Sequence, residues 1–102
     1  MTQDFQSAED AAVGILPELE NLAKNSGIRI IDIRPRTPKR GNLFTETLIE
    51  LKTEADVAGY LKFIYNIENS LLLLKVQEFR LDSKPGTQVL DGNFSISQIS
   101  LD

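Results

Sequence analysis

The residues best suited to binding a ligand form one basic cluster in the segment 34–40. Guanidinium and ammonium groups bind carboxylates and phosphates, so the cluster is a candidate site for an anion or an acidic partner. Its members are Arg34, Arg36, Lys39 and Arg40. The alternative interpretation is a solvated loop whose charges keep the chain soluble, and the sequence leaves both interpretations open.

The sequence lacks the combinations of residues that perform catalysis. The chain has no histidine and no cysteine, which removes the commonest general base, zinc thiolate sites and disulfides. Ser95, Ser97 and Ser100 lack a base that could activate them, and their alternation predicts an exposed strand face instead. Paired carboxylates, a glycine-rich phosphate loop and metal-ligand spacings are also absent from the sequence. We therefore expect a protein that is not an enzyme and holds no cofactor or metal.

The overall charge argues against nucleic acid as a partner. Eleven Lys and Arg against fifteen Asp and Glu give a formal net charge of −4 and a pI near 4.8. Proteins that bind the phosphate backbone need an excess of basic groups. RNA-recognition sheets also stack bases on exposed aromatic side chains, and the candidates here, Phe79 and Phe94, are expected to pack inward.

An amphipathic helix beginning near Thr53 organises the rest of the chain. Thr53 is a suitable N-cap, and Asp56 lies three residues later, where a capping carboxylate belongs. Apolar residues recur at helical steps on one face: Val57, Tyr60, Leu61, Ile64, Ile67 and Leu71. Phe63 and Tyr65 widen this stripe. We expect Tyr60, Phe63 and Tyr65 either to pack in the core or to contact a partner chain.

A strand is predicted from Leu71 to Leu81, directly after the helix. Its alternation slips by one residue before Phe79, which indicates a β-bulge near Gln77 and Glu78. The alternative is that Phe79 simply faces outward.

This strand is expected to form an edge of the sheet. Natural proteins seldom leave a long apolar edge unpaired. Leu71, Leu73 or the backbone of the strand are therefore candidate contacts with another chain, unless these leucines belong to the core.

The remaining elements are a further helix and three more strands. A helical stripe from Ala8 to Ala23 is interrupted by Pro17, which predicts either a kinked helix or a fresh start with Pro17 in the first turn. Strands are expected over 28–34, 43–52 and about 90–101, with a type II turn at Pro85-Gly86. In the last strand the expected inward positions are Leu90, Gly92, Phe94 and Ile96.

The element order is helix, hairpin, helix, hairpin, which is an αββ unit used twice. We expect an α+β domain with one four-stranded antiparallel sheet and both helices on one face, a circularly permuted ferredoxin-like fold. In that arrangement the second and fourth strands are central, and the first and third are edges. A chain of 102 residues forms one domain of this kind.

Four segments of the chain resemble the PilO and type II secretion M-protein (GspM-like) family. They are residues 16–30 (LPELENLAKNSGIRI), 48–52 (LIELK), 60–69 (YLKFIYNIEN) and 74–81 (LKVQEFRL). The resemblance is a matter of pattern and brings no catalytic residues with it. It implies a periplasmic αββαββ domain of a bacterial inner-membrane protein, preceded in the family by a transmembrane helix and a coiled coil.

The resemblance also implies partners and boundaries. Residues 1–16 are expected to be the end of the stem and 17–102 the ferredoxin-like domain. Membrane attachment would depend on a segment outside this sequence, and a complete chain would instead be cytoplasmic. Expected partners are a second copy of the chain and platform subunits of similar fold in a type IV pilus or type II secretion system.

Two functional hypotheses follow. The first is a protein–protein interaction domain of such an assembly platform, acting through homodimers or heterodimers. The second is a small-molecule regulatory module of the ACT type, which uses related sheets and binds ligands between subunits. The sequence does not identify the pilus or secretion system, the partner or the geometry of a dimer.

Overall fold

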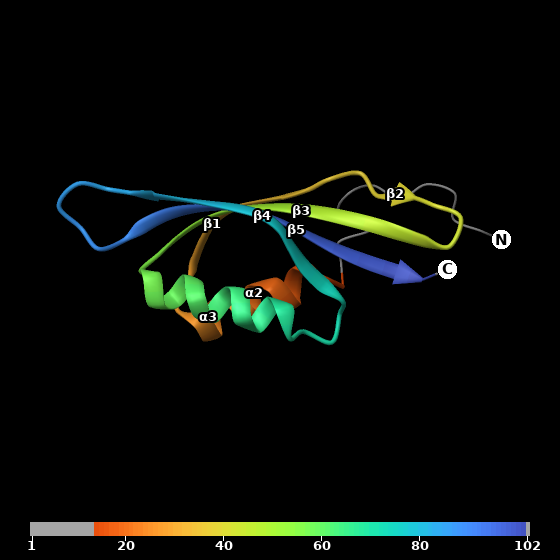
Figure 1. Cartoon of the computed structure of the whole chain (residues 1–102), viewed down its shortest axis with the longest axis horizontal. Helices are drawn as coiled ribbons and strands as arrows, with labels where there is room; N and C mark the ends of the chain where they lie inside the picture. The colour runs from red at the N-terminus through yellow and green to blue at the C-terminus, as the bar shows by residue number, and fades with distance from the viewer. Residues whose placement is uncertain (1–13, 102) are drawn as a thin grey trace.

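One antiparallel sheet carries two helices on a single face (Figure 1). The computed structural model describes residues 14–101 and measures 55 × 22 × 20 Å. The helices are α2 (Leu16–Ser26) and α3 (Val57–Glu68). The strands are β1 (Arg29–Pro35), β2 (Lys39–Arg40), β3 (Phe44–Ala55), β4 (Leu74–Ser83) and β5 (Leu90–Leu101). This arrangement confirms the predicted α+β, ferredoxin-like class.

The strand order is β1-β3-β5-β4, which confirms that the second and fourth main strands are central. β3 and β5 pair over their full length, from Phe44 opposite Leu101 to Ala55 opposite Leu90. The two-residue strand β2, which the sequence did not predict, lies within the basic loop and pairs with the beginning of β3. The main edges of the sheet are therefore β1 and β4.

β4 contains the predicted bulge. Val76 lies opposite Ile96 and Glu78 lies opposite Ser95, so Gln77 is the extra residue. The insertion brings Phe79 opposite Phe94, and the two rings stack with centroids 5.7 Å apart. Phe79 thus lies on the helix side of the sheet although it is half exposed, because β4 is an edge strand.

The first described helix follows the fresh-start alternative at Pro17. α2 begins at Leu16 with the proline in its first turn, where a missing N–H costs no hydrogen bond. It ends at Gly27, whose left-handed φ of 77° suits glycine. The upstream part of the predicted stripe lies outside the described residues. Ile15, on the stem side of the expected boundary, is buried, and the boundary itself stays a prediction.

The N-terminus of α3 differs from the prediction. Asp56, not Thr53, is the N-cap, and its carboxylate accepts a hydrogen bond from the backbone N–H of Gly59 at 2.8 Å. Thr53 instead belongs to β3, because the β3–β5 ladder continues to Ala55. The helix therefore starts one turn later than expected.

The core lies between the helices and the sheet. Phe94 is its centre: the Phe63 ring meets it edge-on at 5.4 Å and the Tyr60 ring lies 5.7 Å away. Ile49 and Leu51 of β3 are buried. Of the predicted inward residues of β5, Gly92, Phe94 and Ile96 are buried and Leu90 is half-buried. Full burial of one such side chain contributes about 1.5–3 kcal/mol.

Two sequence predictions about the sheet are wrong in detail. β4 starts at Leu74, because residues 71–73 form the turn that connects it to α3. Ser97 is buried rather than exposed, and its hydroxyl accepts a hydrogen bond from the side-chain amide of Gln77 at 2.7 Å. The bulge thus brings the Gln77 amide to Ser97, the one buried serine of the described strands.

Candidate interaction surface

Two cations of the basic cluster form ion pairs within the chain. The Arg34 guanidinium lies 2.8 Å from Asp32, and that of Arg36 lies 2.7 Å from Glu50. Lys39 is paired in register with Glu46 across the β2–β3 ladder. These carboxylates reduce the positive charge that the cluster offers to an anion, and an anion site there stays a prediction.

A groove of about 550 Å³ separates the basic loop from the helix-free face of the sheet. Cationic Arg36 and Lys39 line it opposite three carboxylates, those of Glu46, Glu50 and Glu78. In residues 14–101, His, Cys, Asp and Glu form no group that could hold a metal ion. Two of the charges that line the groove already pair with each other, since the Arg36 guanidinium lies 2.7 Å from Glu50.

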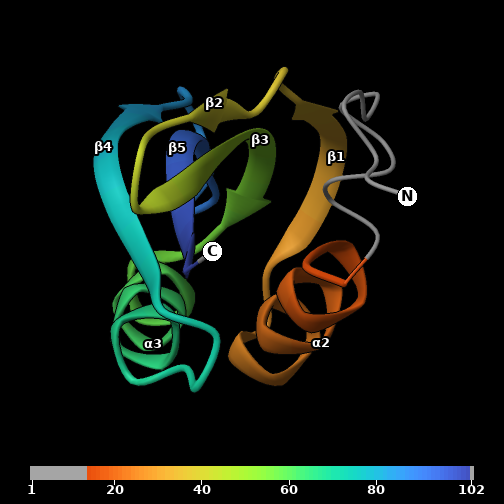
Figure 2. The same cartoon turned by 90° about the vertical axis from the view of Figure 1, so that its right-hand side faces the viewer.

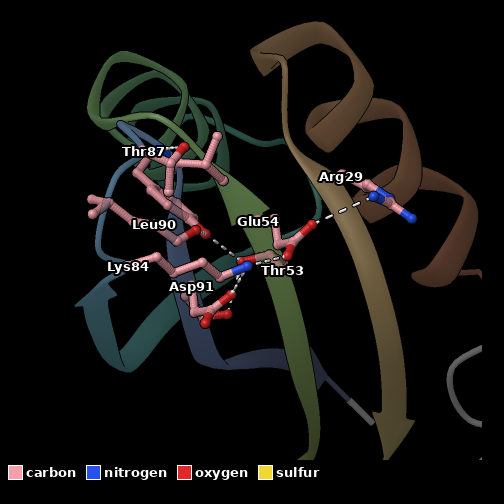
Figure 3. A network of polar contacts seen from close by, with 10 residues as sticks. Arg29, Thr53, Glu54, Lys84, Thr87, Leu90 and Asp91 are labelled. Atoms are coloured by element: carbon pink, nitrogen blue, oxygen red, sulfur yellow. Dashed lines mark hydrogen bonds and ion pairs between the residues drawn. The ribbon is translucent and has the colours of Figure 1, made fainter.

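A second polar cluster secures the β4–β5 hairpin (Figure 3). The Lys84 ammonium lies 2.6 Å from Glu54 and 3.2 Å from Asp91, and Glu54 also contacts Arg29 at 3.5 Å. Hydrogen bonds to Glu54 and Asp91 raise the pKa of the Lys84 ammonium. The ion pairs join Arg29 of β1, Glu54 of β3 and Asp91 of β5, with Lys84 of the hairpin loop between the last two.

Two of the predicted interface residues belong to the core. Tyr60 is 1% exposed and Phe63 is fully buried, so neither is available to a partner chain. Burial raises the pKa of the Tyr60 phenol. Its hydroxyl donates to the Leu90 carbonyl and contacts the Thr53 hydroxyl, both at 3.0 Å, while Thr53 donates to the Gly92 carbonyl at 2.8 Å. These bonds satisfy the buried polar groups that join α3 to the sheet.

The other three predicted residues are on the surface. Tyr65 is exposed on α3, and Leu71 and Leu73 are exposed in the turn before β4 rather than in the edge strand. Leu73 has a left-handed φ of 55°, a conformation that is costly for a leucine. Whether any of the three contacts a partner stays a prediction.

A larger apolar surface lies between the outer side of α3 and the edge strand β4. On the helix, Val57, Leu61 and Ile64 follow one another at helical steps. Glu68 continues this row and accepts a hydrogen bond from the Val76 N–H at 3.1 Å, which places the row beside β4. A groove of about 480 Å³ runs between the two elements. We name as the α3–β4 surface the residues Val57, Leu61, Ile64, Tyr65, Val76 and Phe79.

The sequence did not identify most of this surface. Val57 and Leu61 were assigned to the buried face, yet they are 55% and 65% exposed. Tyr60 and Ile67 of the predicted stripe are buried as expected, together with Phe63. Both rows have helical spacing, so periodicity alone gives no signal for choosing between them. Among the described residues, four of the exposed large apolar side chains (Val57, Leu61, Tyr65 and Phe79) fall on this surface.

Comparison with solved structures identifies the class of fold. The type 4 fimbrial biogenesis protein PilO from Pseudomonas aeruginosa is similar with a TM-score of 0.80 at 12% identity, over 95% of this chain and 73% of that chain. The core region of PilO from the same type IV pilus system gives 0.75 at 13% identity, over 87% and 93%. A structure from Akkermansia muciniphila gives 0.77 at 15% identity, over 99% and 58%.

The resemblance to PilO is confirmed at the level of fold. No protein-family model and no curated protein sequence matches the chain, so the likeness rests on architecture. None of the helices within residues 14–101 is long and apolar enough to cross a membrane.

Proposed function

We propose that this chain is a non-enzymatic interaction domain of the assembly platform of a type IV pilus or type II secretion system. The observation that carries the proposal is the exposed α3–β4 surface on a PilO-like fold. Soluble monomers rarely leave a contiguous apolar patch in water without using it for association. The similarity to two PilO structures supports the choice of system.

The domain acts by pairing with a second copy or with a platform subunit of similar fold. The proposal assigns the domain to the bacterial periplasm, with attachment to the inner membrane through a segment outside this sequence. Arg34, Arg36 and Lys84 already pair with carboxylates of the chain, so the proposal assigns the contact with the partner to the apolar α3–β4 surface.

Sedimentation velocity over a range of concentrations tests the proposal. Leu61→Asp places a charge in the α3–β4 surface, where the leucine is 65% exposed, whereas Leu43→Asp places one on another exposed leucine elsewhere, at 76% exposure. We expect self-association, or binding to a platform subunit, to weaken in Leu61→Asp and to be unchanged in Leu43→Asp. A chain that stays monomeric at every concentration and binds no platform subunit would contradict the proposal.

Circular dichroism and urea unfolding serve as the fold control for both variants. Because the two leucines are exposed, each substitution should change the free energy of unfolding by less than about 0.5 kcal/mol. A loss of association in a variant that keeps this stability is then a loss of contact and not of structure.

A further inference from the structure

The edge strand β4 is free to accept another strand in a way that β1 is not. β1 has a register break between Ile30 and Asp32 and ends at Pro35, which lacks an N–H. Both features blunt an edge against strand addition. In β4 the bulge lies at Gln77, and Val76 already gives its N–H to Glu68. The segment after the bulge, residues 78–83, keeps a regular ladder with β5.

The charges on this segment alternate in sign on the helix-free face. Glu78, Arg80 and Asp82 lie opposite Ser95, Asn93 and Asp91 of β5, so they share that face. Phe79 lies between the first two charges on the helix face and is 51% exposed. Arg80 has an exposed contact with Asp82 at 3.3 Å, of the kind that contributes little to stability.

We propose that a second copy of this chain adds antiparallel to β4, with the two-fold axis beside Phe79. This inference rests on the proposed function and specifies its partner and contact. In that register Phe79 faces Phe79 of the second copy, and Glu78 faces Arg80 in both directions. Directly opposed side chains on one face of a sheet are close enough for aromatic and opposite-charge pairs to form.

Neighbouring registers are less favourable. An axis at Glu78 opposes two Glu78 carboxylates, and an axis at Arg80 opposes two guanidinium groups. An axis at Leu81 pairs Arg80 with Asp82, which already contact each other within one strand. It also pairs Glu78 with Lys84, which is already held by Glu54 and Asp91. That register would also leave Phe79 facing Ser83.

The same axis joins the apolar parts of the two copies. A two-fold perpendicular to the sheet keeps the helices of both copies on one side of a continuous sheet. α3 lies beneath β4 and α2 beneath β1 (Figure 2), so the two α3 helices become neighbours. Leu61 and Ile64 then supply the apolar contact that the short ladder lacks.

Charge reversal provides a test that specifies the register. Glu78→Arg opposes two positive groups in each pair, and Arg80→Glu opposes two negative ones. Each variant alone should raise the dissociation constant of the homodimer about tenfold or more, since two pairs change from attraction to repulsion. An equimolar mixture of the two variants restores opposite charges in both pairs, so we expect it to form a heterodimer close to wild-type affinity.

Matched reversals on α2 are the control. Glu20→Arg and Lys24→Glu change the same charges on exposed positions far from β4, and neither should weaken the dimer. Single variants that dimerise like the wild type, or a mixture as weak as its components, overturn the pairing while leaving the proposed function in place. The same holds if the wild type binds only a platform subunit. A wild type that associates with neither contradicts the proposed function as well.

Discussion

Gly92 and Tyr60 pack so closely that the effect of Gly92→Ala depends on the residue at position 60. A Cβ on Gly92 would lie 2.6 Å from the Tyr60 hydroxyl oxygen and 2.7 Å from the ring atoms Cε1 and Cζ. The ring cannot move away freely, because it packs against Phe94 and its hydroxyl is bonded to β3 and β5. Overpacking of this kind costs about 1–3 kcal/mol.

The magnitude follows from two opposing terms. Alanine in place of glycine within a strand normally gains about 0.5–1 kcal/mol. We therefore expect Gly92→Ala to lower the free energy of unfolding by about 1–2 kcal/mol in the wild type. In a Tyr60→Leu background the ring is gone, and the same change should be neutral or stabilising. The interaction energy between the two sites is then about 2 kcal/mol, within the range of directly contacting residues.

Urea unfolding of the four proteins in this double-mutant cycle measures that energy. A third background, Tyr60→Phe, removes the hydroxyl but keeps Cε1 and Cζ, so Gly92→Ala should remain destabilising there. If Gly92→Ala costs the same with tyrosine and with leucine at position 60, the close packing of ring and backbone is not what constrains this strand.

Three further predictions concern stability. Leu73→Gly should raise the free energy of unfolding by about 0.5–1 kcal/mol, because it relieves a left-handed φ of 55°. Leu71→Gly, at an exposed position without that φ, should not raise it. Equal effects of the two substitutions in urea unfolding would argue against strain at Leu73. In the same assay, Phe63→Ala should lower the free energy of unfolding by about 3–5 kcal/mol and Leu61→Ala by less than about 0.5 kcal/mol, because only Phe63 is buried. The reverse order would mean that α3 packs with its other face on the sheet. Burial raises the pKa of Tyr60 in the folded state. The contribution of this residue to the free energy of unfolding is therefore fully present below the unfolded pKa near 10 and is lost as the pH rises above it. The free energy of unfolding of Tyr60→Phe should decline less steeply at alkaline pH, and identical profiles of the two proteins from pH 8 to 11 would refute this.

The strand order and the bulge could be predicted because local patterns determine them. Two hairpins separated by a helix leave few ways to form one sheet, and the slip in alternation before Phe79 indicated an extra residue near Gln77. The turn at Pro85-Gly86 was equally local, and Gly86 has the positive φ that this turn requires.

The limits of the packed face of α3 could not be predicted, because they depend on contacts distant in sequence: Tyr60 was predicted on that face and is buried, whereas Leu61 was predicted there and is exposed. Two apolar rows on the helix have the same spacing, and the choice between them is made by β5. Gly92 leaves room for the Tyr60 ring, and Phe94 receives Phe63 edge-on. The N-cap of α3 was assigned to Thr53 for a similar reason, since Thr53 pairs with Gly92 in the ladder between β3 and β5 and this contact is distant in sequence. The α3–β4 surface was not identified from the sequence because it includes the apolar row of α3 that these contacts leave exposed.

The unequal edges of the sheet limit how many copies can join. Strand addition at two open edges lets identical units polymerise without end. Here the break at Ile31 and the terminal Pro35 close one side, so once β4 is occupied no equivalent edge remains for a third copy. Strand addition by this route therefore ends at a dimer, so it gives a complex of fixed size and not a filament.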